Sequence, residues 1–153
     1  MDSKARSRIE ALLDAQSFVE IGALVKSRST DFVREAEREA SDGVICGYGS
    51  ISGKPVYIYS QNRDVLSGSI GEMHGRKIAH LYDMAIKMGA PVVELLDSAG
   101  VRLEEATDGL YALSKIYKKK AQAKGLIPLY TVVYKPAGEW QFFPLFPIFV
   151  LWR

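Results

Sequence analysis

Four consecutive residues, Asp97-Ser98-Ala99-Gly100, combine a carboxylate, a hydroxyl and two small residues in the pattern best suited to chemistry. They follow the apolar run Val92–Leu96 and precede a helical pattern that starts near Arg102. A tight turn between a buried strand and a helix start presents backbone N–H groups that can receive an anion. The turn therefore predicts a binding site for a negatively charged group.

The same residues also allow simpler interpretations. Asp97 or Ser98 can cap the helix that follows, since both side chains accept hydrogen bonds from helix N-termini. Arg102 either attracts a phosphate group or is simply solvated at the start of that helix. Upstream, Ser67-Gly68-Ser69 either lies along a ligand or forms a flexible linker. The residues by themselves leave these alternatives open.

The other reactive side chains form no recognisable motif. His74 and His80 are six residues apart, so on a helix they point in different directions and are expected at or near the surface. We predict no metal site. Cys46 is expected in the core, and as the single cysteine it predicts a reducing, cytoplasmic location. The run Lys118–Lys120 is expected to be a solvated helix end.

The hydrophobic pattern predicts the elements that position the turn. Helices are expected over Ala5–Leu13, through Ile78, Leu81, Met84, Ala85 and Met88, and through Leu110, Leu113, Ile116 and Tyr117 to Lys120. Strands are expected at Ser17–Gly22 (a short strand or extended arm), Gly43–Ser50, Lys54–Ser60, Val92–Leu96 and Ile127–Val133, with Lys26–Ser41 as a solvated connection. Helical crossovers between apolar strands predict a layered α/β architecture with a parallel part to its sheet.

Composition narrows the class of protein. The chain has 153 residues, enough for one domain with a real core. Its formal net charge of +2 is too balanced to predict a nucleic-acid partner. The charged N-terminus lacks the apolar stretch of a signal peptide, and no segment is long and apolar enough to predict a membrane span.

The sequence changes character after Tyr134. The stretch PAGEWQFFPLFPIFVLWR holds both tryptophans, four of the six phenylalanines and three of the six prolines. Its pattern is neither helical nor alternating, so no element is predicted there. It is expected to be either an adhesive apolar tail or a terminal arm that docks on the core or on a partner.

Three stretches carry a resemblance to a known family: ARSRIEALLDAQSFVEIG, DGVICGYGSISGKPVYIYSQNRDVLSGSIGEMHGRKI and APVVELLDSAGVRLEEA. Over Ala5–Val133 the chain resembles the N-terminal part of the carboxyltransferase subunits of biotin-dependent acyl-CoA carboxylases, such as acetyl-CoA and propionyl-CoA carboxylase β subunits. DSAGVRLEE is similar to the family's Asp-Ser-Gly-Gly-Ala-Arg-hydrophobic-Gln-Glu signature. It departs from that signature at Ala99, Val101 and Glu104.

The resemblance implies the crotonase-like (ClpP/crotonase) layered ββα fold, in incomplete form. It also implies transfer of a carboxyl group from carboxybiotin to the α-carbon of an acyl-CoA, through an enolate stabilised by backbone amides. By resemblance, the catalytic amides are those of Ala99 and Gly100. The substrate-binding residues implied in the same way are Ser67, Gly68, Ser69, Asp97, Ser98 and Arg102.

The family further implies biotin as a cofactor carried on a partner protein, with none bound covalently to this chain. The implied partners are the biotin carboxyl carrier, the biotin carboxylase component and further copies of the chain. One alternative is a truncated, non-catalytic fragment of such a ligase or transferase. A weaker alternative is a crotonase-type acyl-CoA hydratase or isomerase.

The resemblance also suggests an origin for the tail. The family places a second glycine-rich turn shortly after the strand expected at Ile127–Val133, and that turn is absent here. Read in a shifted frame, the tail's codons can encode Gly-Val-Ala-Val followed by Leu-Ser-Asp-Phe, which resembles the family's continuation. We therefore expect residues 1–134 to be family sequence and residues 135–153 to be an aberrant, frameshifted tail.

Overall fold

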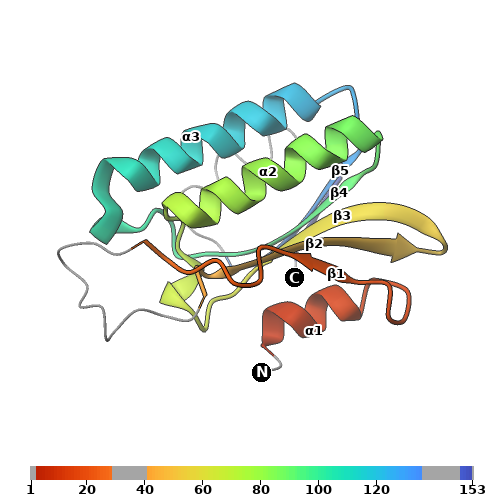
Figure 1. Ribbon diagram of the computed structural model, residues 1–153, viewed down its shortest axis with the longest axis horizontal. Coiled ribbons are helices and arrows are strands. Elements are labelled where there is room, and N and C mark those ends of the chain that lie inside the picture. The colour runs from red at the N-terminus through yellow and green to blue at the C-terminus, as the bar shows by residue number, and fades with distance from the viewer. Residues whose placement is uncertain (1–2, 29–40, 136–148, 153) are drawn as a thin grey trace.

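The computed structural model describes residues 3–28, 41–135 and 149–152, and these form a six-stranded sheet flanked by helices (Figure 1). The helices are α1 (Lys4–Glu10), α2 (Glu72–Met88) and α3 (Ala106–Ala123), and the short 3-10 turns are η2 (Leu66–Gly68) and η3 (Leu103–Glu105). The strands are β1 (Val19–Ile21), β2 (Val44–Ile51), β3 (Lys54–Gln61), β4 (Val92–Asp97), β5 (Leu129–Lys135) and β6 (Phe149–Trp152).

The strands lie side by side in sequence order, from β1 to β6. β1, β2 and β3 pair antiparallel, whereas β3, β4, β5 and β6 pair parallel. The strands predicted at Gly43–Ser50 and Lys54–Ser60 are confirmed, and they form a hairpin with Ile51 opposite Lys54 across the turn. The predicted parallel part is confirmed too, because α2 and α3 provide the crossovers that parallel neighbours require.

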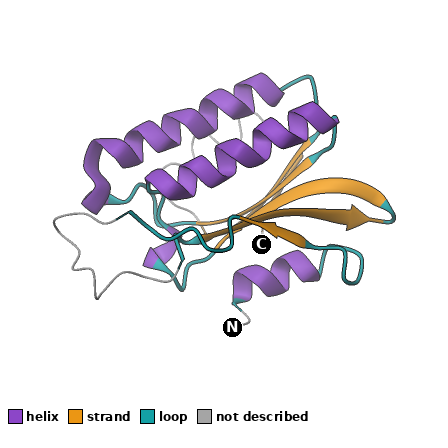
Figure 2. Cartoon of the chain, viewed as in Figure 1, coloured by secondary structure: helices purple, strands orange, loops and turns teal. Residues whose placement is uncertain are grey.

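Each face of the sheet is covered by a different layer (Figures 1 and 2). α2 and α3 lie side by side on one face, and α1 lies on the other. Val92 and Leu96 of β4 join the cluster under α2 and α3, whereas Val93 and Leu95 join the cluster under α1. β4 is therefore buried on both faces, as its continuous apolar run predicts.

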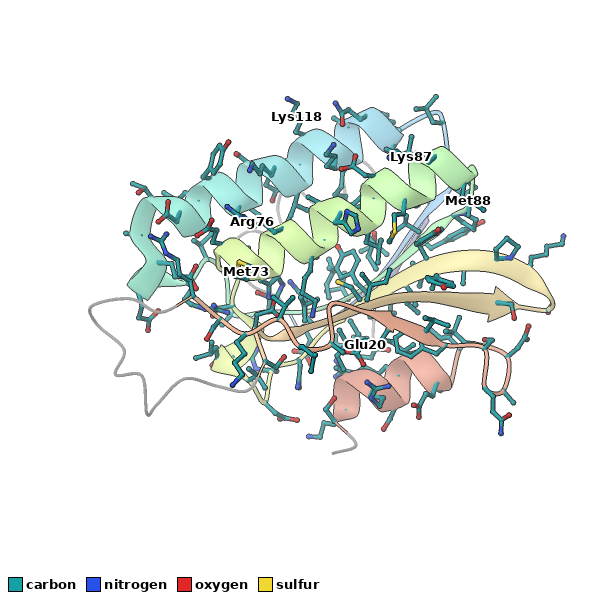
Figure 3. The ribbon with its side chains drawn as sticks, viewed as in Figure 1. Glu20, Met73, Arg76, Lys87, Met88 and Lys118 are labelled. Carbon is teal, nitrogen blue, oxygen red and sulfur yellow. The ribbon has the colours of Figure 1, made fainter. Side chains whose placement is uncertain are left out.

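α2 contains the helical run predicted through Ile78, Leu81 and Ala85. Gly71 is the N-cap, and Gly89 ends the helix in a left-handed conformation with a φ of 64°. Of the predicted apolar residues, Ile78, Leu81 and Ala85 are buried in the core, and Met84 packs against it. The prediction is wrong for Met88, which is 66% exposed because it lies in the last turn (Figure 3).

Lys120 is a fully buried cation, so the prediction of a solvated end at Lys118–Lys120 is wrong for this residue. Its Nζ donates to Oε2 of Glu94 at 2.7 Å, and Tyr82 and Thr131 also donate to that carboxylate. Burial lowers the pKa of Lys120, and the negative charge of Glu94 opposes that effect. The partner carboxylate lies on β4, so helical spacing within α3 cannot reveal the pair.

Residues 136–148 and 153, which make up most of the tail, lie outside the described residues, as do residues 29–40 of the connection Lys26–Ser41. β6 is a correction to the sequence prediction, which placed no element in the tail. It pairs in parallel with β5, with Phe149 opposite Tyr130 and Trp152 opposite Val133. Within the described part of the chain, no helix has the length and apolar character to cross a bilayer.

Candidate functional site

Two turns meet at the carboxyl ends of neighbouring parallel strands. The first consists of η2 and Ser69 and follows β3, and the second, Ser98–Gly100, follows β4. Because β3 and β4 are parallel, both strands end at the same edge of the sheet, where α/β proteins bind ligands. The predicted site residues all lie in or beside these turns: Ser67, Gly68, Ser69, Asp97, Ser98, Ala99, Gly100 and Arg102.

Backbone hydrogen bonds join the two turns. The Ala99 N–H donates to the Ser67 carbonyl at 3.0 Å. The Ile70 N–H donates to the Gly100 carbonyl at 2.8 Å, and the Arg102 N–H donates to the Ile70 carbonyl at 2.9 Å. The last two bonds form a further parallel bridge beyond the ends of the strands. The structure therefore brings together two segments that lie far apart in the sequence.

The amides implied to stabilise an enolate both have acceptors inside the chain. Ala99 donates to Ser67, and the Gly100 N–H donates to Oγ of Ser98 at 3.1 Å. Ala99 is exposed, whereas Gly100 is buried. A thioester oxygen that binds here would therefore replace an internal acceptor.

The first turn is built from left-handed backbone conformations. The φ angles of Leu66, Ser67 and Gly68 are 48°, 55° and 66°. Position 68 requires glycine, because a Cβ there would lie 2.4 Å from the carbonyl oxygen of Asp97. Oγ of Ser69 donates to the Leu66 carbonyl at 2.6 Å. The segment is a hydrogen-bonded turn packed on the second turn, so the interpretation as a flexible linker is wrong.

Asp97 ends β4 between two arginines. Nη2 of Arg8 in α1 is 2.8 Å from its Oδ2, and Nη1 of Arg63 is 3.6 Å from its Oδ1. Asp97 is buried, and Arg8 also stacks on the ring of Tyr134 at 3.7 Å. These contacts hold the start of the second turn from the α1 side of the sheet.

Neither Asp97 nor Ser98 caps the following helix, so this structural interpretation of the turn is wrong. The N-cap of α3 is Glu105, and no side-chain hydrogen bond caps that helix. The η3 turn separates the site turn from α3, which places both candidate caps too far from its first N–H groups. Ser98 uses its hydroxyl within its own turn instead.

Arg102 is only 4% exposed, so the interpretation as a solvated arginine is wrong. Its guanidinium donates to Oε1 of Glu105 at 2.6 Å, to the Ser69 carbonyl at 2.8 Å and to the Asp42 carbonyl at 3.1 Å. Its Nε also donates to Oγ of Ser69 at 3.1 Å. Arg102 therefore ties the two turns to the chain around them, and direct contact with a CoA phosphate stays a prediction.

His74 lies behind the turns at the start of α2, the end that Met73 marks in Figure 3. It is fully buried, which corrects the expectation of a surface histidine. Its Nδ1 is 3.1 Å from the Asp42 carbonyl, and its Nε2 is 3.4 Å from Nε2 of Gln61. Burial, with the Arg102 charge as a second cause, lowers the pKa of His74 to about 3, so the ring is neutral at pH 7.

The remaining reactive groups of the described chain lie apart from the turns. No three His, Cys, Asp or Glu side chains gather as metal ligands within residues 3–28, 41–135 and 149–152. Cys46 lies in the core as predicted, and burial raises the pKa of its thiol to about 12. His80 is exposed, as expected.

Sequence reasoning missed the groups that support the turns: the side chains of Arg8, Gln61 and Glu105 and the backbone carbonyl of Asp42. Of these, Gln61 gave a local signal, since it is a polar residue at the end of an apolar strand. Arg8 gave none, because its partner Asp97 is 89 residues away in the sequence.

Comparison with known proteins places this geometry in a family. The carboxyl transferase domain matches residues 3–146. The chain belongs to the carboxyl transferase family. This match runs past residue 134 and into the tail.

Two relatives in the carboxyl transferase family are carboxylase subunits. The propionyl-CoA carboxylase beta chain of Cereibacter sphaeroides is 42% identical over 134 residues, which cover 88% of this chain and 26% of that protein. The biotin-dependent acetyl-/propionyl-coenzyme A carboxylase beta5 subunit of Mycobacterium tuberculosis is 42% identical over 148 residues, covering 96% of this chain and 27% of that subunit. The chain thus spans about a quarter of these relatives' length.

A solved structure of the family has nearly the same fold. Transcarboxylase 12S, with methylmalonyl-coenzyme A and methylmalonic acid bound, is similar with a TM-score of 0.91 and 33% sequence identity. The similarity covers 97% of this chain and 29% of that one. The fold is therefore the crotonase-like layered α/β fold that the resemblance implies.

Proposed function

We propose that this chain forms the acyl-CoA side of a carboxyltransferase active site. In the proposed reaction, a carboxyl group passes from carboxybiotin to the α-carbon of an acyl-CoA through an enolate of the thioester. The observation that carries the proposal is the pair of joined turns at the carboxyl ends of β3 and β4, found in a chain of the carboxyl transferase family. The similar transcarboxylase 12S has methylmalonyl-coenzyme A bound.

The chemical task at the turns is to stabilise the negative charge that forms on the thioester oxygen when the α-carbon loses its proton. N–H groups aimed at that oxygen lower the energy of the enolate. In the proposal, the oxygen replaces the Ser67 carbonyl as the acceptor of the Ala99 N–H. A neutral thioester gains little from that exchange, whereas a charged enolate gains more, because hydrogen bonds to charged acceptors are stronger.

We also propose the cofactor and partners that the family implies. Biotin on a carrier protein would supply the carboxyl group, and the carrier, the biotin carboxylase component and further copies of this chain would be partners. The name of the Mycobacterium tuberculosis subunit supports a biotin-dependent system. The single buried cysteine supports a cytoplasmic location.

Calorimetric titration of the full chain with propionyl-CoA tests the site. In Gly68→Ala, the new Cβ would meet the Asp97 carbonyl and separate the turns. We expect binding to weaken by about tenfold or more. Gly53→Ala is a matched control, because Gly53 also has a positive φ, 74°, but a Cβ there meets nothing within 4 Å. It should bind as the unchanged chain does.

The binding results test the site assignment and the proposed function separately. Equal affinity in both variants and the unchanged chain would refute the assignment of the turns, and a complete lack of binding would refute the proposed function. We expect no turnover by the chain alone, in line with a non-catalytic fragment, because the second glycine-rich turn that the family uses is absent from the sequence. Measurable decarboxylation of methylmalonyl-CoA by the purified chain would contradict the alternative that the chain is a non-catalytic fragment.

A further inference from the structure

The carbonyl oxygen of Asp42 lies at the centre of the polar groups behind the two turns. It is 3.1 Å from Nδ1 of His74 and accepts from Nη2 of Arg102, also at 3.1 Å. A carbonyl has no proton to donate, so Nδ1 of His74 must carry one. In a neutral ring, Nε2 is then without a proton and can only accept. The contacts of His74 therefore select one tautomer.

Gln61 continues this chain of hydrogen bonds to the second turn. Its Nε2 is 3.4 Å from Nε2 of His74, and its Oε1 accepts the Asp97 N–H at 3.0 Å. In the reverse amide orientation, Oε1 of Gln61 would face the acceptor Nε2 of His74, and Nε2 of Gln61 would face the N–H donor of Asp97. All three residues are buried, where mismatched polar groups are costly. One amide orientation of Gln61 therefore matches a donor to an acceptor at both His74 and the Asp97 N–H.

We propose that His74 and Gln61 are positioning residues that set the placement of the turn Ser98–Gly100. They form an uncharged relay from α2 to the backbone N–H of Asp97, the residue before that turn. The relay thereby fixes where the Ala99 amide stands relative to a thioester oxygen. Its functional meaning rests on the proposed acyl-CoA site, but its hydrogen bonds can be measured without any ligand.

The first measurement reads the tautomer directly. Long-range proton–nitrogen NMR spectra of the isotopically labelled full chain at neutral pH should show Nδ1 of His74 protonated and Nε2 bare. His80 is exposed and provides an internal reference for a solvated ring. A ring protonated on Nε2, or on both nitrogens, would overturn the relay.

The second measurement changes the relay without changing its shape. In Gln61→Glu, the side chain still accepts the Asp97 N–H but has no proton for His74. A carboxylate beside the ring favours the imidazolium, so the pKa of His74 should rise from about 3 by about 1–3 pH units. The cations Arg102 and Lys77 oppose this rise. The Ala99 and Gly100 amide resonances should shift with the same titration.

Gln122→Glu is the matched control for this experiment. Gln122 lies on exposed α3 surface and lines a groove of about 350 Å³ that also contains His80. It should leave the His74 pKa unchanged. The relay would be refuted if the pKa of His74 were unchanged in Gln61→Glu. It would also be refuted if the amide resonances of Ala99 and Gly100 did not shift as His74 titrates.

The third measurement separates positioning from general stability. His74→Asn keeps a donor near the Asp42 carbonyl but removes the acceptor for Gln61. Hydrogen exchange at the Asp97 and Ala99 amides should accelerate about tenfold, while core amides such as that of Ile58 keep their rates. A uniform acceleration would refute the positioning role, and Gln61→Glu decides the matter if this variant does not fold. Failure of the unchanged chain to bind propionyl-CoA would refute the proposed function alone.

Discussion

The backbone of Ala106 adopts a conformation that few residues other than glycine tolerate. Its φ is 46° and its ψ is −122°, at the junction of η3 and α3. The preceding residue, Glu105, is fixed from two sides, by Nη1 of Arg102 at 2.6 Å and by the Glu72 N–H at 2.6 Å. The strained position thus follows directly on a residue whose side chain is held in place.

We expect Ala106→Gly to raise the free energy of unfolding by about 0.5–2 kcal/mol, because relief of strain exceeds the added entropy of the unfolded chain. Ala121→Gly, at an exposed helical position of α3, should lower it by about 0.5–1 kcal/mol. Urea denaturation measures both. A loss of stability in both variants would contradict the strain at Ala106.

His74 also determines how stability responds to acid. Its pKa is about 3 in the folded chain and 6.5 when unperturbed, so between these values the unfolded chain binds more protons. Stability is therefore fullest above pH 6.5 and falls as the pH decreases toward 3, by at most about 1.4 kcal/mol per pH unit from this residue. Urea denaturation across this range should show a smaller pH slope for His74→Asn. An equal slope would contradict the buried, neutral ring.

At the scale of elements, α2 and α3 approach closely at one glycine. A Cβ on Gly75 would lie 2.6 Å from Cβ of Ala112, and both residues are buried. This contact lets two helices share one face of the sheet and brings the start of α2, with His74, toward the turns. Gly75 acts here through its lack of a side chain.

We expect Gly75→Ala to lower the free energy of unfolding by about 1–3 kcal/mol, because overpacking outweighs the better helix propensity of alanine. The double variant Gly75→Ala/Ala112→Gly moves the methyl group from α3 to α2 and should restore part of the loss. Thermal unfolding followed by circular dichroism measures both. The contact would be contradicted if the double variant lost more free energy of unfolding than Gly75→Ala and Ala112→Gly lose together.

The sequence predicts the elements well wherever the signal is local. The position of α2 follows from the spacing of Ile78, Leu81 and Ala85, and β4 follows from its apolar run. Burial of His74 and Lys120 escaped prediction, because a polar side chain is buried only when a partner from another element satisfies it. The candidate site shows the same limit. The sequence predicts the turn Ser98–Gly100, but the hydrogen bond from the Ala99 N–H to the Ser67 carbonyl depends on the pairing of β3 and β4, which local sequence does not reveal.

At the scale of the whole molecule, the tail, residues 135–153, differs in character from the rest of the chain. The family match runs to residue 146, and β6 pairs with β5, so similarity and sheet both extend past residue 134. We propose that residues 135–153 are read from a shifted frame of family sequence. The encoding DNA should contain an adjacent open frame for Gly-Val-Ala-Val followed by Leu-Ser-Asp-Phe. The absence of such a frame would refute this origin.

The supporting contacts of the site share one further property. Apart from Arg8, the described residues named above as hydrogen-bonded to the two turns lie in the single segment from Asp42 to Glu105. The two ends of that segment meet, since the Asp42 carbonyl binds Arg102 at 3.1 Å and Arg102 binds Glu105. The candidate site is thus held by a segment that closes on itself at Arg102, so a change at Asp42 and a change at Glu105 should disturb the same point of the site.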